Sequence, residues 1–576
     1  MSRYKLLRIG LYVVVGIIAA RLFQIQIIQH DEWVAKAEAQ QTSQSTIIAK
    51  RGEIYMMDGS QPVVVAMNEK IWTVSVDPAI TDQDEAQRVV EQYAHNEIIA
   101  DWNDVFADKS KRYYVVARNV SRQAAENIAN AQVKGIVLQE NTKRMYPEES
   151  LGSSVLGFVN AEGNGQYGVE GTFDDELKGK NGLLKTVTDV NNVALSIGDN
   201  NVRIPAQNGT NIVLTIDRNL QSKVEQILEQ QMRSMGKTHA SALVMNPRNG
   251  KVLAMANLPS YNPSEYNKVT DASLFSNGIL DDPYEPASVC KTFALASSID
   301  QGKMTKDSTY TNTGSVTIDG WEIKNAEQGS YLLGRQTMQT VMNYSLNTGS
   351  IQALRWLGGS EDDITQRGRE LLYDYYYNRF GLGQYTGIEL NEAAGQIAKP
   401  NEGYGLNATY ANMTFGQNIQ LTMMQVAAAF SSVVNGGQYY TPTIIAGEMQ
   451  DGDFKANETK AAVRRTISED TSTQMRELLY GTRHAWRDAG VDQAGYYIGG
   501  KTGTAQVIKD GEYSSDETRA TYIGFGGTEG ELPEYVIMVR IWKDGTKSDG
   551  QTNALPVFNA LKSYVQDYLR VKPKGV

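Results

Sequence analysis

The chain has 576 residues, more than a single hydrophobic core usually serves, so we expect two or three domains. Its 55 basic and 66 acidic residues give a net charge of −11, which argues against a nucleic-acid partner because such a partner requires a basic face. A single cysteine excludes an intramolecular disulfide, and the four histidines show no metal-ligand spacing, so we expect no metal and no cofactor.

The N-terminus carries a hydrophobic segment, Leu6 to Ile28, that predicts a single membrane anchor. Arg3 and Lys5 precede this segment, so we expect a cytoplasmic N-terminus and the bulk of the chain outside the cytoplasm. The charge-free part, Ile9 to Ala20, is short enough to leave a cleaved signal peptide as the alternative. Arg21 fits a retained anchor if its long side chain reaches the outer interface.

After the anchor the sequence predicts an α+β domain, which we call the pedestal. Short β-like runs such as Ile71 to Val76 alternate there with alanine-rich helical stretches such as Ser121 to Gln132. The turn-rich tetrapeptide Gln207 to Thr210 marks its end. The predicted domains are residues 1–28 (cytoplasmic tail and anchor), 29–205 (pedestal) and 206–576 (C-terminal domain).

Beyond this boundary, alternating strand and helix signals predict a sheet covered by helices, with an all-helical stretch inserted into it. Asp217 is the expected N-cap of the first helix, and Asn249-Gly250 favours a tight hairpin turn. The expected strands are Asn211 to Ile216, Ser241 to Met245, Lys251 to Ala256, Thr521 to Phe525 and Tyr535 to Ile541, and the expected helices extend from Asp217 to about Arg233 and from Pro556 to Leu569.

The octapeptide PASVCKTF, residues 286–293, contains two candidate nucleophiles, Ser288 and Cys290. Pro286 suits the first turn of a helix. At about 100° per residue, Ser288 and Lys291 lie about 60° apart on one face, whereas Cys290 is rotated about 200° from Ser288. A nucleophilic cysteine also needs a nearby histidine or an electropositive pocket. We therefore predict that Ser288 is the nucleophile and that Cys290 is a small buried residue.

Two further motifs accompany this serine. Ser-x-x-Lys and Ser-x-Asn each recur by chance elsewhere in the chain, but Ser288/Lys291 is followed by Ser345/Asn347 and then by Lys501-Thr502-Gly503-Thr504, which occurs once. In this order the three motifs resemble the active-site signature of penicillin-binding transpeptidases and serine β-lactamases.

Other stretches narrow the resemblance to class B penicillin-binding proteins, the single-anchor transpeptidases of peptidoglycan synthesis, and they extend it over nearly the whole chain. They are Arg21 to Phe23, Arg144 to Pro147, Gly168 to Gly171, Leu177 to Gly179, Leu214 to Asp217, Gly250 to Met255, Thr414 to Gln417 and Asn435 to Gly437. The chain departs from the family at Ala287, where Gly is usual, and at Cys290. Met56 and Met57 stand where family members usually have an Asp-Arg pair. We therefore do not expect the usual polar contacts between the pedestal and the catalytic domain at these two positions.

The serine hydroxyl needs a base, and with no histidine in reach we assign that role to Lys291. The base must be the neutral amine, so its pKa must be lowered by burial, by the positive end of the helix and by a second cation such as Lys501. The strand edge Lys501 to Thr504 offers a cation and the hydroxyls of Thr502 and Thr504 to a terminal carboxylate, and Gly503 leaves room for a substrate along the strand.

The resemblance implies the penicillin-binding transpeptidase fold, a multi-domain α/β architecture whose central, mainly antiparallel sheet is flanked by helices. It implies that residues 206–576 are the catalytic domain and that the pedestal, residues 29–205, is similar to a dimerisation domain. It also implies that Ser345 relays a proton to the leaving amine and that Asn347 orients the substrate and Lys291. The backbone N–H groups of Ser288 and Thr504 would form the oxyanion hole.

The reaction implied by the resemblance is acyl transfer. Ser288 attacks the D-alanyl-D-alanine end of a stem peptide, D-alanine leaves, and an amine of a neighbouring strand takes the acyl group; β-lactams would acylate the same serine. The expected partners are lipid-linked glycan strands, a membrane-embedded glycosyltransferase and other membrane proteins of the division or elongation machinery.

Within the family we expect the septal, cell-division role rather than the elongation role. A β-lactamase or β-lactam sensor shares the three motifs but does not account for the pedestal. A non-catalytic scaffold that has kept the fold is the other alternative, and the intact Ser288, Lys291, Ser345 and Lys501 argue against it.

Overall fold

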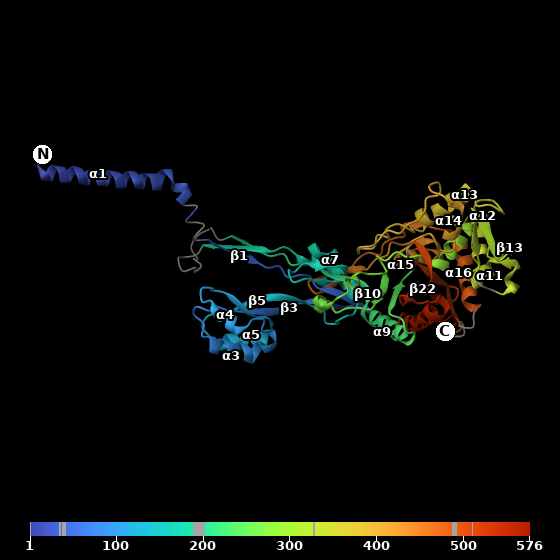
Figure 1. The fold of residues 1–576 in the computed structure, drawn as a ribbon, viewed down its shortest axis with the longest axis horizontal. Helices are drawn as coiled ribbons and strands as arrows, with labels where there is room; N and C mark the ends of the chain where they lie inside the picture. Colours follow the sequence, from blue (N-terminus) through green and yellow to red (C-terminus); the bar gives the residue numbers. More distant parts are fainter. Residues whose placement is uncertain are drawn as a thin grey trace. The chain divides into compact units, whose positions relative to one another are not determined.

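The computed structural model describes residues 2–33, 36, 42–187, 202–326, 329–485, 492–509 and 511–575 (Figure 1). The chain forms two compact units, Met1–Gly52 with Asp175–Thr210, and Glu53–Asp174 with Asn211–Val576. The predicted pedestal is therefore divided between the two units, and its residues 188–201 lie outside the described residues. The division into three domains stays a prediction.

The first unit contains helix α1 (Arg3–Phe23), which continues as a π-helical turn, η1 (Gln24–Ile28). Within the described residues, Arg3–Ile28 is the one helix long and apolar enough to cross a membrane, and it buries none of its side chains against the protein. Arg21 donates a hydrogen bond to Gln24 Oε1 near its end. An antiparallel sheet in the order β1-β8-β9 completes the unit, with β1 at Thr42–Ile47, β8 at Gly182–Val187 and β9 at Val202–Ile204.

The second unit begins with a seven-stranded sheet in the order β19-β18-β10-β2-β3-β4, to which β5 adds by pairing with β3. Strand β2 of the predicted pedestal pairs in parallel with β10 of the predicted catalytic domain, so one sheet joins the two regions. Helices α3 (Gln83–Ala94) and α5 (Arg122–Asn130) bury their apolar faces on β3 and β4. The strands are β2 (Ile54–Asp58), β3 (Gln61–Val76), β4 (Tyr114–Val120), β5 (Ile136–Met145), β10 (Asn211–Asp217), β18 (Ile445–Gln450) and β19 (Asp453–Ala456).

Polar anchoring between β2 and the catalytic region is present despite the two methionines. Met56 is fully buried, as its apolar side chain requires. Next to it, Asn219 donates to Asp58 Oδ1 (2.6 Å), and the backbone N–H of Gly59 donates to Asp217 Oδ2 (2.9 Å). The hydrogen bonds on the β2 side therefore come from Asp58 and Gly59, the two residues that follow the methionines in the sequence.

Two stretches that carry the family resemblance meet in this unit. Arg144 on β5 donates through Nε to Oε1 of Glu170 on α7 (Gly168–Thr172) at 2.6 Å, and both side chains are buried. Removing one partner of such a pair leaves an uncompensated buried charge, so the pair specifies how β5 and α7 meet.

The predicted catalytic sheet has five antiparallel strands in the order β12-β11-β23-β22-β21, which confirms the predicted fold class. Asp217 caps α9 (Arg218–Ser234), as predicted, by accepting from the backbone N–H groups of Asn219 and Leu220. Helices α9 and α17 (Leu555–Tyr568) cover one face of the sheet. The strands are β11 (His239–Met245), β12 (Val252–Leu258), β21 (Tyr496–Lys509), β22 (Glu512–Thr528) and β23 (Tyr535–Trp542).

Two local predictions were wrong. The turn between β11 and β12 extends from Asn246 to Lys251 rather than over two residues, because only Gly250 of the Asn-Gly pair has a positive φ (76°). The inserted stretch is not all helical, since β13 (Thr309–Asn312) pairs with β16 (Gly334–Thr337) and β14 (Ser315–Ile318) with β15 (Trp321–Lys324). Its helices are α10 (Lys291–Asp300), α11 (Met338–Tyr344), α12 (Asn347–Leu357), α13 (Gln366–Tyr373), α14 (Leu406–Met413), α15 (Met423–Val434) and α16 (Glu469–His484).

Candidate active site

The predicted nucleophile lies on a 3₁₀ turn, η5 (Ala287–Cys290), that leads directly into α10. Pro286 precedes this turn instead of occupying its first position. A 3₁₀ helix has three residues per turn, so side chains three apart lie one above the other. Ser288 and Lys291 therefore meet, with Nζ of Lys291 2.9 Å from Oγ of Ser288.

The residue before the serine has a left-handed backbone. Ala287 has a φ of 53°, a conformation that glycine adopts at no steric cost and alanine does not. The loop that follows α14 holds it in place, because the Ala287 N–H donates to the Gly416 carbonyl (3.2 Å). A Cβ at Gly416 would lie 2.1 Å from the Ala287 carbonyl oxygen, so this approach requires glycine there.

The second motif lies where two helices meet. Ser345 ends α11 with a φ of 57°, and Asn347 begins α12. A non-glycine residue in this region costs free energy and is often found at functional sites. The side-chain amide of Asn347 donates to the Lys324 carbonyl on β15 (2.8 Å), which orients its Oδ1 towards Lys291.

The amine of Lys291 is the centre of the site. Its Nζ lies 2.9 Å from Ser288 Oγ, 2.9 Å from Ser345 Oγ, 2.6 Å from the Ser345 carbonyl oxygen and 2.8 Å from Asn347 Oδ1. Burial, and then the charge of Lys501, hold the pKa of Lys291 well below its usual range. The carbonyl and the amide oxygen can only accept, so they take the two N–H groups of a neutral amine. The single lone pair of the amine is then available to one serine hydroxyl at a time, that of Ser288 or that of Ser345.

Lys501 reaches the same cluster from edge strand β21. Its Nζ lies 3.2 Å from Ser345 Oγ, 3.2 Å from the Thr502 carbonyl oxygen and 3.3 Å from Thr502 Oγ1. Burial lowers the pKa of Lys501 to about 7, and the carboxylate of Asp549 opposes this effect. Ser345 thus lies between two lysines, which is the position a proton relay needs.

Gly503 has a packing reason to be glycine. A Cβ there would lie 2.7 Å from the Pro286 carbonyl oxygen and 3.3 Å from a Val289 methyl group, so only glycine lets β21 approach the serine turn. Thr504, one residue on, is exposed. Its hydroxyl donates to Asp549 Oδ2 (3.1 Å) and accepts from the Gly550 N–H (3.0 Å). The oxyanion hole from the N–H groups of Ser288 and Thr504 stays a prediction.

Cys290 lies on the serine turn between Ser288 and Lys291, and its thiol differs from their side-chain groups in environment. It is fully buried, and burial raises the pKa of its thiol, so the thiolate that a nucleophile requires is disfavoured.

Three side chains near the site, Glu285, Phe415 and Asp549, were not predicted as site residues. The Glu285 carboxylate accepts from the Asn418 N–H (2.8 Å) and the Tyr513 hydroxyl (2.9 Å), which joins the serine turn to the β21–β22 hairpin. The Phe415 ring lies 5.8 Å from Nζ of Lys291, and Asp549 contacts Thr504. Glu285 is three residues before Ser288 in the sequence, whereas only the fold brings Asp549 to the site.

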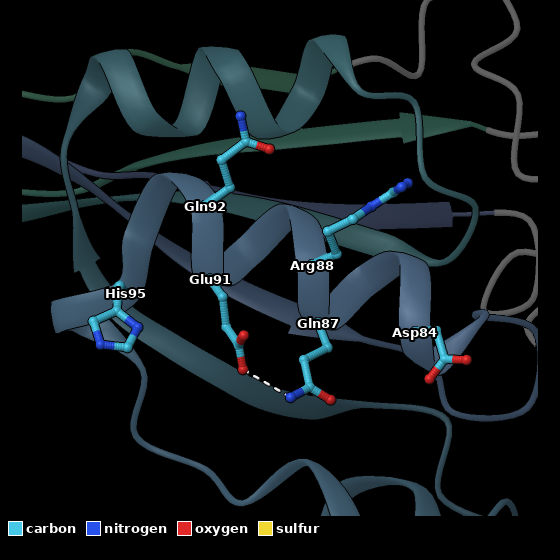
Figure 2. A pocket seen from close by; sticks show the side chains of 6 residues that line it. All are labelled: Asp84, Gln87, Arg88, Glu91, Gln92 and His95. Carbon is cyan, nitrogen blue, oxygen red and sulfur yellow. Dashed lines mark hydrogen bonds between the residues drawn. The ribbon is translucent and has the colours of Figure 1, made fainter.

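A surface hollow on the polar face of α3 is separate from these residues (Figure 2). Its lining includes neither a serine, a cysteine nor a lysine, and Gln87 donates to Glu91 along the helix (2.7 Å). It therefore lacks a nucleophile with an adjacent base. Its lining residues are Asp84, Gln87, Arg88, Glu91, Gln92 and His95.

Residues 240–562 match the penicillin binding protein transpeptidase domain, and residues 46–214 match the penicillin-binding protein dimerisation domain. Stage V sporulation protein D of Bacillus subtilis is 33% identical over 469 residues, which cover 79% of this chain and 69% of that protein. The chain belongs to the class B penicillin-binding proteins. As a member of that family it is a serine-type peptidoglycan D,D-transpeptidase.

Other relatives of this penicillin-binding protein agree. The peptidoglycan D,D-transpeptidase FtsI of Buchnera aphidicola is 25% identical over 97% of this chain and 94% of its own length. Penicillin Binding Protein 2X of Streptococcus thermophilus has a TM-score of 0.72 at 20% identity, over 90% of this chain and 80% of that one. A peptidoglycan synthetase of Bifidobacterium adolescentis has a TM-score of 0.70 at 22% identity, over 93% of this chain and 98% of that one. The two structures support the fold.

Proposed function

We propose that this transpeptidase works through an acyl-enzyme on Ser288. Oγ of Ser288 attacks the carbonyl carbon of the terminal D-alanyl-D-alanine bond, and its proton passes to Nζ of Lys291. The C–N bond then breaks, Ser345 delivers a proton to the departing D-alanine amine, and the ester stays on Ser288. An acceptor amine attacks the ester, loses its proton to the same relay and restores the Ser288 hydroxyl.

The observation that carries this proposal is the environment of the Lys291 amine. Two oxygens that can only accept engage its N–H groups, and a serine hydroxyl lies 2.9 Å from Nζ. Burial and Lys501 favour its neutral form. This is the arrangement of an activated nucleophile beside its base. Lys501 and Thr502 are the groups we assign to the terminal carboxylate of the substrate; the hydroxyl of Thr504, which the sequence led us to expect in the same role, donates to Asp549 Oδ2.

Labelling with a fluorescent penicillin, followed by peptide mapping, tests the assignment. We expect the label on Ser288 in the native chain and in Cys290→Ala, and no label in Ser288→Ala. Label retained in Ser288→Ala would show that another atom is the nucleophile, and a native chain that takes no label would support the scaffold alternative. Rapid turnover of the β-lactam would favour a β-lactamase.

We propose the septal role for this enzyme, supported by its similarity to FtsI of Buchnera aphidicola over nearly the full length of both chains. Depletion from its native host should then give filaments with incomplete septa, and a fluorescent fusion should collect at mid-cell. Swollen cells with a dispersed fusion would instead indicate the elongation role.

We also propose that α1 is a retained single-pass anchor with a cytoplasmic N-terminus, and that α1 and the pedestal contact a membrane-embedded glycosyltransferase. The basic residues at the start of α1 and its fully exposed apolar surface support this arrangement. Replacing α1 with an unrelated span should keep the protein in the membrane but reduce co-purification of the polymerase. A soluble, processed chain in the native host would contradict the anchor.

A further inference from the structure

Asp549 brings a negative charge to the part of β21 that we assign to substrate binding. It follows β23 and begins the π-helical turn η9 (Gly550–Ala554). Its Oδ1 accepts from the backbone N–H groups of Gln551 (2.9 Å) and Thr552 (3.0 Å), while its Oδ2 accepts from the Thr504 hydroxyl (3.1 Å). The carboxylate is exposed, so it faces the same solvent-accessible edge that a substrate must approach.

The contact between η9 and β21 is close enough to fix this arrangement. A Cβ at Gly550 would lie 2.6 Å from the Gly503 carbonyl oxygen and 2.9 Å from the Thr521 carbonyl oxygen. Only glycine at 550 therefore allows the Asp549-Gly550 pair to lie against the strand edge. The Thr504 hydroxyl is held between the two residues, because it donates to Asp549 and accepts from Gly550 N–H.

These contacts decide what Thr504 can offer to a ligand. A hydroxyl has one proton and two lone pairs, and here the proton is used on Asp549 and one lone pair on Gly550. The remaining lone pair can accept a hydrogen bond from a ligand. A ligand carboxylate, by contrast, would meet an oxygen without a free proton beside a second carboxylate, and like charges in proximity repel.

We propose that Asp549 is a specificity-determining residue that makes Thr504 a hydrogen-bond acceptor and opposes a ligand carboxylate at that position. The terminal carboxylate of the substrate is then held by Lys501 and Thr502 alone. N–H groups or cations are favoured next to Thr504. This inference rests on the proposed function, because it assumes that ligands acylate Ser288 along β21.

The decisive variant is Asp549→Asn, which removes the charge and keeps a side chain that caps helices well. Its amide oxygen can still accept from the η9 N–H groups, and its NH₂ can donate to Thr504 Oγ1, which frees the Thr504 proton for a ligand carboxylate. We expect the second-order rate constant of acylation by benzylpenicillin at about pH 6 to rise about tenfold, the usual gain from one charge-assisted hydrogen bond.

Ionic strength separates this role from a structural one. The part of the effect that comes from charge at an exposed site is screened by salt, so the ratio of the variant rate to the parent rate should fall from low to high salt. Asp544→Asn is the matched control, since it removes the same charge from another exposed position between β23 and η9. We expect its acylation rate to equal that of the parent.

Thr504→Val completes a double-mutant cycle. The loss of the hydroxyl should slow acylation more in the Asp549→Asn background than in the parent, because only there does Thr504 donate to the ligand. The pH must be held near 6 because Asp549 raises the pKa of Lys501 against the effect of burial. Removing Asp549 therefore lowers the pKa of Lys501, so Lys501 loses its proton at a lower pH than in the parent. Above about pH 7 this loss of positive charge would slow acylation, whereas the loss of the Asp549 charge would speed it.

The outcomes distinguish the two proposals. A faster, salt-sensitive Asp549→Asn with the melting temperature of the parent supports the inference. An unchanged or slower Asp549→Asn, in a chain whose parent is labelled on Ser288, overturns the inference and leaves the proposed function intact. If Asp549→Asn has a lower melting temperature than the parent, the same acylation rates are measured in Asp549→Ser, which also introduces a neutral capping side chain. A faster, salt-sensitive Asp549→Ser then supports the inference, and an unchanged or slower one overturns it. A parent that takes no label at Ser288 refutes the proposed function itself.

Discussion

Two segments that contact each other at the site, the serine turn with the start of α10 and the edge of β21, differ in the burial of their polar groups. We call the first the buried wall and the second the exposed wall. Lys291, the first residue of α10 after the serine turn, is completely buried, and its amine is within 2.9 Å of four oxygens. Thr504 on β21 is exposed, and its hydroxyl is held by residues of a third segment, Asp549 and Gly550. Burial of Lys291 therefore favours the neutral form of the base. The contacts of Thr504 with Asp549 and Gly550 affect which ligand groups can bind at the exposed strand edge.

The largest expected effect is on the buried wall. Lys291→Met keeps a long side chain in the space but has no amine, so the acylation rate constant should fall by about 10³-fold, the usual contribution of a general base. Stopped-flow or gel-based penicillin labelling measures it. Lys562→Met is the matched control: Lys562 is also buried and pairs with Asp492 (3.0 Å), so its loss should lower the melting temperature but leave the acylation rate near that of the parent.

The next effect tests the contact between the walls. Gly503→Ala would place a Cβ 2.7 Å from the Pro286 carbonyl oxygen, so β21 must move away from the serine turn. A displacement of about 1 Å can cost about 10²-fold in rate, and we expect acylation to slow by that order. Gly545→Ala serves as the control, because its Cβ would meet nothing within 4 Å and only its φ of 72° is strained. Equal acylation rates in the two variants would contradict the packing argument.

The pH dependence distinguishes the two lysines. Lys501 binds a carboxylate only when charged, so ligand affinity before acylation should fall as the pH rises through its pKa of about 7, by up to about tenfold per pH unit. Lys501→Arg keeps its charge at every accessible pH, so its affinity should stay flat over the same range. The acylation step needs neutral Lys291, so its rate should fall as the pH falls through the lowered pKa of Lys291. A falling affinity in Lys501→Arg would assign the pH dependence to another group.

The smallest expected effect is on the backbone of the serine turn. Ala287 has a φ of 53°, and glycine adopts this conformation without the Cβ clash, so Ala287→Gly should stabilise the fold by about 1 kcal/mol. Urea unfolding measures the change. A destabilised variant would show that the greater freedom of glycine in the unfolded chain outweighs the relief of strain.

Local sequence signals were sufficient for much of the fold. The Asp217 cap, the α9 and α17 helices and the β22–β23 pair follow from capping and periodicity, and the structure contains them all. The β11–β12 turn and the β-strand pairs in the inserted stretch were mispredicted, since turn length and short strand pairs depend on what surrounds them. The parallel pairing of β2 with β10 joins Ile54 to Ile212 and Met57 to Asp217, far apart in the sequence, and has no local signal.

For the active site, the sequence by itself determined the Ser288–Lys291 pair, because residues three apart in a helical turn share one face whatever the rest of the chain does. The motifs named Ser345, Asn347 and Lys501, but only the tertiary structure brought them around one amine. Tertiary structure alone decided that Asp549 holds the Thr504 proton and that Gly503 is needed for packing against Pro286. Those contacts join segments distant in sequence, and their geometry depends on the packed sheet rather than on any local pattern of residues.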